Sequence, residues 1–136
     1  MSHLYLSQHL RDQLGLLASL AYPHETCGVL FGKQVQGHIS VHKVEQVAYP
    51  DQIEGDFHLE LLNQQQLDRK TRQQGLEIVG IWRALPDHSH IPSEDERHLV
   101  TPGYSYLIAS VTPVGIAELR SWRLCSNRFE EEDLVS

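Results

Sequence analysis

The stretch Gly80-Ile81-Trp82-Arg83-Ala84-Leu85-Pro86-Asp87-His88-Ser89-His90-Ile91-Pro92-Ser93-Glu94-Asp95-Glu96 decides how the rest of the chain is interpreted. It continues an apolar segment, Leu76 to Trp82, which predicts a buried strand. Ser93 followed by Glu96 three residues later is the pattern of a capping box, and it predicts a short helix from Ser93 to about Val100. We therefore expect a strand, a loop and a short helix in this order.

Two histidines in the loop, His88 and His90, are candidate metal ligands. Imidazoles at positions i and i+2 of an extended segment point to the same side and can share one metal ion. Glu96 or Asp87 could complete such a site with a carboxylate. Histidines in loops are more often exposed residues than ligands, so this pair is one alternative among several.

A different frame starts at Arg83-Ala84-Leu85, which directly follows the apolar residues of the predicted strand. Seven residues separate this tripeptide from Ser93, and two more separate Ser93 from Glu96. Upstream stands Pro23-His24-Glu25-Thr26-Cys27-Gly28-Val29-Leu30-Phe31-Gly32. In these segments the chain resembles the JAMM (JAB/MPN) metalloprotease family, bacterial stand-alone type. The family signature is an upstream Glu, then His-Ser/Thr-His after a strand, seven residues, Ser, two residues and Asp.

The resemblance implies a role for each matching position. Active members hold zinc with two His and one Asp, use the Glu as general base on the zinc-bound water, and stabilise the oxyanion with the Ser. Glu25 and Ser93 take the two catalytic positions, and the three ligand positions are Arg83, Leu85 and Glu96. Neither Arg nor Leu can ligate a metal. The motif is therefore degenerate, and we expect no zinc cofactor unless the site is rebuilt.

Arg83 suggests what replaces the metal. Two buried carboxylates, Glu25 and Glu96, would repel one another without a cation between them. The guanidinium of Arg83 could bridge them. This hypothesis requires Arg83 to lie within about 6 Å of both carboxylates.

The functional hypotheses follow from the resemblance. Bacterial relatives trim ubiquitin-like sulfur-carrier proteins after a Gly-Gly tail, so the leading hypothesis is an impaired JAMM-fold protein with a binding or scaffolding role. Its partner would be such a tail, added as a strand to a sheet edge, or an active JAMM relative. The alternative is an active zinc metallopeptidase or isopeptidase with His88, His90 and Glu96 as substitute ligands. In a third hypothesis, Arg83-Ala84-Leu85 is an altered form of an active enzyme's motif.

Length and composition agree with one globular domain over residues 1–136. The resemblance implies that this domain is α/β (α+β), with a JAB/MPN-like curved mixed β-sheet flanked by helices and a cytidine-deaminase-like architecture. With 40% hydrophobic and 21% charged residues, the chain has neither a disordered composition nor an apolar run that could cross a membrane, and we expect a cytoplasmic protein. The net charge of −7 argues against nucleic acid as a partner.

The remaining elements are read from periodicity and turn residues. A helix capped by Ser7 should bury Leu10, Leu14, Leu17 and Ala21 and end at Tyr22-Pro23, and a second should span Leu59 to Gln74. Strands are expected over Cys27 to Phe31, closed by Gly32, and over Val35 to Val47, Tyr104 to Thr112 and Ile116 to Cys125. The acidic tail beyond Phe129, with Glu130-Glu131-Glu132-Asp133, should add an edge strand. We expect His38 and His42 to be solvated, and Cys27 and Cys125 to be buried thiols.

Overall fold

The computed structural model describes residues 2–48, 75–87 and 91–136. Within this part of the chain, each element takes its label from chain order: β1 (His3–Tyr5), α1 (Gln8–Ala21), β2 (Thr26–Val35), β3 (His38–Ala48), β4 (Glu77–Pro86), the 3-10 helix η2 (Glu94–Leu99), β5 (Ser105–Thr112), β6 (Gly115–Cys125) and β7 (Arg128–Val135). The helix expected over Leu59 to Gln74 lies outside the described residues.

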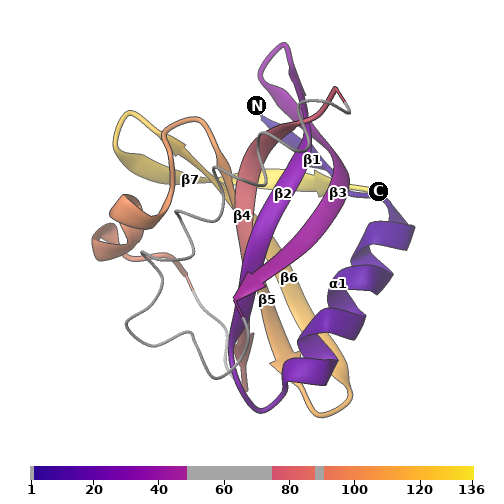
Figure 1. The fold of residues 1–136 in the computed structure, drawn as a ribbon. Coiled ribbons are helices and arrows are strands. Elements are labelled where there is room, and N and C mark those ends of the chain that lie inside the picture. Colours follow the sequence, from indigo (N-terminus) through magenta and orange to yellow (C-terminus); the bar gives the residue numbers. More distant parts are fainter. Residues whose placement is uncertain (1, 49–74, 88–90) are drawn as a thin grey trace.

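The strands form a mixed sheet that closes into a barrel in the order β1-β3-β2-β4-β5-β6-β7 (Figure 1). β4 pairs antiparallel with β2 and parallel with β5, so both of its edges are occupied. The expected strand of the acidic tail is confirmed as β7. It is not an edge, however, because β6 pairs with one side of it and the short strand β1 pairs with the other.

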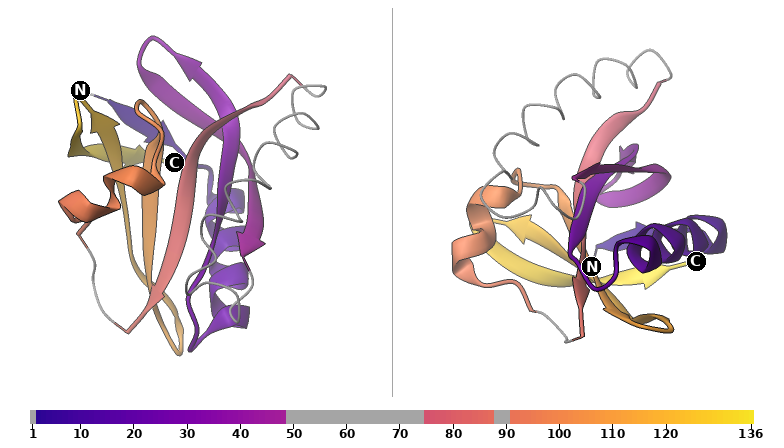
Figure 2. Two further views of the ribbon diagram at one scale, coloured as in Figure 1. Left: turned by 60° about the vertical axis from the view of Figure 1, so that its left-hand side comes forward. Right: turned by 60° about the horizontal axis from the view of Figure 1, so that its bottom comes forward.

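Two apolar clusters pack on opposite faces of this sheet. The first joins Leu10 and Leu14 of α1 to Leu30, Trp82 and Leu107 of the strands. The second lies on the other face and includes Phe31, Ile81, Leu85, Tyr106 and Trp122, with Leu99 at its margin. α1 and η2 accordingly sit on opposite sides of β4 (Figures 1 and 2). Because side chains alternate along a strand, each residue of β4 is assigned to one of these two environments.

The N-terminal helix agrees with its prediction. Ser7 is the N-cap, and its hydroxyl accepts a hydrogen bond from the amide of Leu10 at 3.3 Å. Leu10, Leu14, Ala18 and Ala21 are buried, whereas Leu17 is only partly so. The helix ends before the peptide bond between Tyr22 and Pro23, which is cis. The turn that follows leads into Glu25 and the start of β2.

Gly32 does not close its strand as expected, because β2 continues to Val35 and turns back through Gln36 and Gly37. Its role is close approach: a Cβ at Gly32 would lie 1.9 Å from the carbonyl oxygen of Ser40 on β3. Glycine at this position therefore permits the pairing of β2 with β3, where the register shifts between Phe31 and Gly32.

The two cysteines are free thiols. Cys27 is buried, as expected, beside Arg83 in the pairing of β2 with β4. Cys125 is partly exposed at the end of β6, so the prediction of a buried thiol is wrong there. The strand ends at this residue, and the turn through Ser126 and Asn127 leaves it less covered than the residues before it.

Candidate functional site

Four separate segments bring polar side chains together on the face of β4 that carries the second cluster. Arg83 comes from β4, Tyr106 from β5, Glu25 from the residue before β2, and Glu96 from η2. Alternation places Arg83 on the same side as Ile81 and away from Ala84, which packs into the first cluster. The register of β4 and β5 therefore positions Arg83 and Tyr106, and η2 positions Glu96.

The guanidinium of Arg83 lies between the two carboxylates. One terminal nitrogen, Nη2, is 3.4 Å from Oε2 of Glu25, and the other, Nη1, is 3.6 Å from Oε2 of Glu96. The Arg83 side chain is 18% exposed and that of Glu96 is 13% exposed, so these charges are largely removed from water. Burial by itself lowers the pKa of Arg83, but Tyr106 and the two carboxylates outweigh it and raise the pKa above its usual value. The expected bridge between Glu25 and Glu96 is present.

Tyr106 is a member of this site that was not identified from the sequence. Its hydroxyl donates to Oε2 of Glu96 at 2.6 Å and accepts from Nη1 of Arg83 at 3.0 Å. Burial raises the pKa of Tyr106, and the hydrogen bond to Glu96 acts in the same direction, against the opposing charge of Arg83. A neutral phenol thus links the cation to one of its carboxylates.

Ser93 and Glu96 form the expected capping box at the start of η2. The amide of Ser93 donates to Oε1 of Glu96 at 3.1 Å, and its hydroxyl lies 3.4 Å from the same oxygen. The other oxygen of Glu96 is the one that meets Tyr106 and Arg83. Both carboxylate oxygens are therefore engaged, and the observed contacts of Ser93 are structural.

The described residues do not fit the zinc that the family's ligand set would hold. Leu85, at the second histidine position, is 2% exposed and packs in the second cluster. The first histidine position carries the cation Arg83, which contacts the carboxylate at the third position, Glu96. Across residues 2–48, 75–87 and 91–136, no group of three or more His, Cys, Asp or Glu side chains could hold a metal ion.

The substitute ligands His88 and His90 lie outside the described residues, as does Ser89. Asp87, just before them, has a positive φ of 65° and its amide donates to the carbonyl of Val111 at 2.7 Å. Its carboxylate accepts a hydrogen bond from the hydroxyl of Tyr22 at 2.6 Å, and this hydrogen bond raises the pKa of Tyr22. Asp87 thus fixes the end of β4 to the turn that precedes Glu25.

Strand alternation could have assigned Tyr106 to a face, because it lies two residues before Ile108 in a run with clear strand character. Its contact with Arg83 also requires that β5 lie parallel to β4 with Ile81 opposite Tyr106. No local sequence signal gives that register. The partnership of Tyr22 with Asp87, 65 positions apart, is likewise set by tertiary structure.

The fold is shared with a JAB1/MPN domain protein. The chain belongs to the family of prokaryotic homologs of the JAB domain, which its sequence matches over residues 7–125. No curated protein matches it.

Solved structures share the fold. Protein DSY2949 from Desulfitobacterium hafniense is 22% identical with a TM-score of 0.77, covering 99% of this chain and 92% of its own. A protein from Salinibacter ruber is 28% identical with a TM-score of 0.72, covering 99% and 90%. AF2198 from Archaeoglobus fulgidus, a JAB1/MPN domain protein, is 15% identical with a TM-score of 0.58, covering 100% of both chains.

In the part of the chain that the structure describes, no helix combines the length and apolar character that a membrane span requires.

Proposed function

We propose that this JAB domain binds the extended tail of a ubiquitin-like or sulfur-carrier protein without cleaving it. The observation that carries the proposal is the position of Arg83 between Glu25 and Glu96, at distances of 3.4 and 3.6 Å. A guanidinium there supplies the positive charge that a metal would supply, but it cannot activate water as a Lewis acid. Glu25, which occupies the position of the family's general base, forms an ion pair with this guanidinium.

The cluster remains accessible to a ligand on one side. The side chain of Glu25 is 37% exposed, whereas Arg83 and Glu96 are more deeply buried. An incoming peptide would therefore meet the carboxylate of Glu25 first, and its backbone amides could donate to that group. An active JAB relative is an alternative partner for the same surface.

For the tail we propose a route other than addition as a strand to the edge of a sheet. Addition of a strand at a sheet edge beside the site cannot use β4, because β2 and β5 occupy both of its edges. Binding at this site would instead place the tail over the face of the sheet that carries the second cluster, next to η2.

The test combines zinc titration with a tail-binding measurement. Isotope-labelled, metal-stripped protein is titrated with a peptide that ends in Gly-Gly and followed by NMR. We expect shifts centred on residues near Glu25 and Arg83, and weaker binding by Glu25→Ala, which removes the accessible acceptor. Asp12→Ala is the matched control, because Asp12 lies on α1, on the opposite side of the sheet from η2. A carrier protein extended beyond its Gly-Gly tail should remain intact, with or without added zinc.

Two outcomes would contradict the proposal that the domain binds the tail without cleaving it. If zinc binds in one equivalent, the extended carrier is cleaved, and His88→Ala/His90→Ala abolishes both, the protein is a metallopeptidase with rebuilt ligands. If the Gly-Gly peptide causes no shifts and zinc causes no cleavage, the tail-binding proposal is wrong as well.

A further inference from the structure

The barrel closes along a seam, where the short strand β1 lies between β3 and β7. β1 runs parallel to both neighbours, and its register places Leu4 opposite Ile39 of β3 and Leu134 of β7. All three residues belong to the first cluster or pack against it. The residues one position earlier therefore lie side by side on the outer face of the seam, because neighbouring positions on adjacent strands share a face. They are His38 of β3, His3 of β1 and Asp133 of β7.

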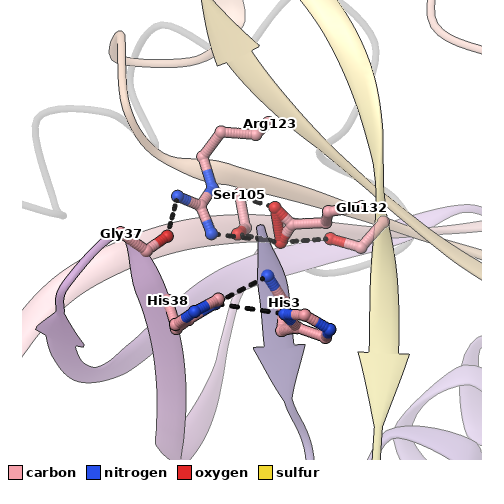
Figure 3. A network of polar contacts seen from close by, with 7 residues as sticks. His3, Gly37, His38, Ser105, Arg123 and Glu132 are labelled. Atoms are coloured by element: carbon pink, nitrogen blue, oxygen red, sulfur yellow. Dashed lines mark hydrogen bonds and ion pairs between the residues drawn. The ribbon is translucent and has the colours of Figure 1, made fainter. Parts of the chain in front are cut away.

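The two imidazoles face one another across the seam. Nδ1 of His3 lies 3.2 Å from Nδ1 of His38, and the ring centroids are 4.8 Å apart (Figure 3). On the other side of its ring, Nε2 of His3 is 3.6 Å from Oδ2 of Asp133. His38 is half-buried and contacts another histidine, so the expectation of a solvated side chain is wrong for this residue. His42, further along β3, is exposed, as expected.

The backbone of β1 fixes the protonation state of His38. The amide of His3 donates to Nδ1 of His38 at 3.2 Å. This nitrogen therefore carries a lone pair, and the proton of the neutral ring is on Nε2. A further proton can only be added at Nδ1, where it meets the N–H of His3. Protonation of His38 thus breaks the hydrogen bond between its side chain and β1.

His3 can take up a proton without such a conflict. Its Nδ1 faces the lone pair of His38 and its Nε2 faces the carboxylate of Asp133, so an imidazolium at this position has an acceptor on each side. Charging His38 as well places two imidazolium rings in contact. The pair is therefore compatible with one positive charge and opposes a second.

The other ionisable groups on the outer face, among the described residues, supply no counter-charge for a second imidazolium. Tyr5 of β1, whose ring centroid is 6.3 Å from that of His38, is neutral below about pH 9. Lys33 of β2 lies opposite Ser40 of β3 and adds a positive charge to the same face. On β7, the exposed carboxylate of Glu131 is paired with Arg120.

The seam has few contacts that could oppose its opening. β1 pairs with β3 at two register positions, so the hydrogen bond from His3 to His38 is a large part of their contact. On the inner side, Arg123 donates to the carbonyl of Gly37, and its charge is paired with that of the buried Glu132 (Figure 3). This ion pair fixes the turn before β3, so β1 is the element that can be released.

We propose that protonation of His38 opens the seam between β1 and β3, so that closure of the barrel is a pH-dependent switch. Near neutral pH, His38 accepts from the amide of His3 and the barrel is closed. In acid, the open form takes up a proton that the closed form opposes, so falling pH favours opening. Opening leaves the edge of β3 beside Ile39 and Ser40 unpaired and able to accept another strand.

The test is hydrogen exchange of the full chain, followed by NMR and corrected for the intrinsic effect of pH on exchange. Histidine side chains change charge between about pH 5 and 8, so the two ends of that range are compared. We expect the protection of the amides of β1 to fall at least about tenfold at the lower pH, while those of β5 keep theirs. Equal protection of β1 at both pH values would overturn the proposal. An equal loss in β1 and β5 would also overturn it, since that pattern indicates acid unfolding of the whole domain.

A pair of matched variants assigns the effect to His38. His38→Asn places an oxygen acceptor where Nδ1 stands but does not titrate, so the protection of β1 should be the same at both pH values. His42→Asn, at the exposed histidine of the same strand, should lose protection in acid as the parent does. A His38→Asn protein that loses as much protection as the parent would show that another group opens the seam.

A second measurement does not depend on the folding of any variant. The nitrogen chemical shifts of the histidine rings in the parent protein report which nitrogen carries the proton. Neutral His38 should carry it on Nε2, because Nδ1 accepts from the amide of His3. A proton on Nδ1 of neutral His38 would contradict the hydrogen bond on which the switch depends.

Discussion

Arg83 balances two carboxylates that come from different segments, and removing its charge should expose their repulsion. We expect Arg83→Met to destabilise the protein by about 1–3 kcal/mol, less than for a fully buried pair because the cluster is partly exposed. Adding Glu96→Gln removes one of the carboxylates left unpaired. In a double-mutant cycle followed by urea unfolding, the double variant should therefore lose less stability than the sum of the single variants. Strict additivity would show that Arg83 and Glu96 are not coupled.

Tyr106 gives the site a dependence on alkaline pH. In the unfolded chain a tyrosine ionises near its usual pKa of about 10, whereas burial raises the pKa of Tyr106 in the folded protein. Above pH 10 the unfolded chain has lost a proton that the folded protein keeps, so the free energy of unfolding falls as pH rises. The slope approaches about 1.4 kcal/mol per pH unit between the two pKa values.

Tyr106→Phe should remove this component of the slope. Urea unfolding of both proteins from about pH 8 to about pH 11 would measure it. Tyr22, whose pKa is also raised, is present in both and cancels in the comparison. Parallel slopes in the two proteins would contradict the assignment of a protonated Tyr106.

Part of this site could be predicted from the sequence, through the resemblance to the JAMM family. The resemblance implies that Glu25, Arg83 and Glu96 share one site, and the ion-pair bridge was then expected because two neighbouring carboxylates need a cation between them. The same reasoning could not find Tyr106 or Tyr22, since a tyrosine in a strand or after a helix carries no sign of its hydrogen-bond partner.

At the scale of elements, β7 shows how alternation divides a run of like charges. Glu131 is exposed and pairs with Arg120 at 2.8 Å. Glu132 is buried and accepts from Nε of Arg123 at 2.9 Å and from the hydroxyl of Ser105 at 2.8 Å (Figure 3). Arg123 in turn donates to the carbonyl of Gly37 at 2.8 Å, which connects β6 to the turn between β2 and β3.

These neighbouring acids should respond very differently to the same substitution. Glu132→Gln leaves the charge of Arg123 buried without a counterion and should cost roughly 3–5 kcal/mol. Glu131→Gln, the matched control on the same strand, should cost less than about 1 kcal/mol because its ion pair is exposed to water. Thermal or urea unfolding measures the free energy of unfolding of both variants. Similar decreases for the two variants would show that the buried contacts of Glu132 do not stabilise the pairing of β6 with β7.

The helix α1 and the strands β5 and β6 could be predicted from the sequence, because their apolar periodicity and flanking turn residues are local signals. The acidic tail was predicted as a strand, but the burial of Glu132 was not. In a run of four acids, only the pairing partner decides which member is turned inward, and Arg123 belongs to another strand.

At the scale of the whole molecule, a mixed sheet was expected and its closure was not. Closure requires β1 to pair with β3 and β7 at the same time, and β1 is only three residues long. Such a strand has no periodicity to detect. Its pairing is decided by the distance between two partners that are far apart in the sequence.

The closure of the barrel by β1 also has a consequence for how the protein is made. Residues 3–5 cannot complete their pairing until residues 133–135 have been synthesised, although they leave the ribosome first. Closing so long a segment costs chain entropy, and contacts of this kind form late. Until residues 133–135 emerge, α1 and the strands that follow it must therefore assemble around an open gap, and the nascent barrel presents unpaired backbone on both sides of that gap.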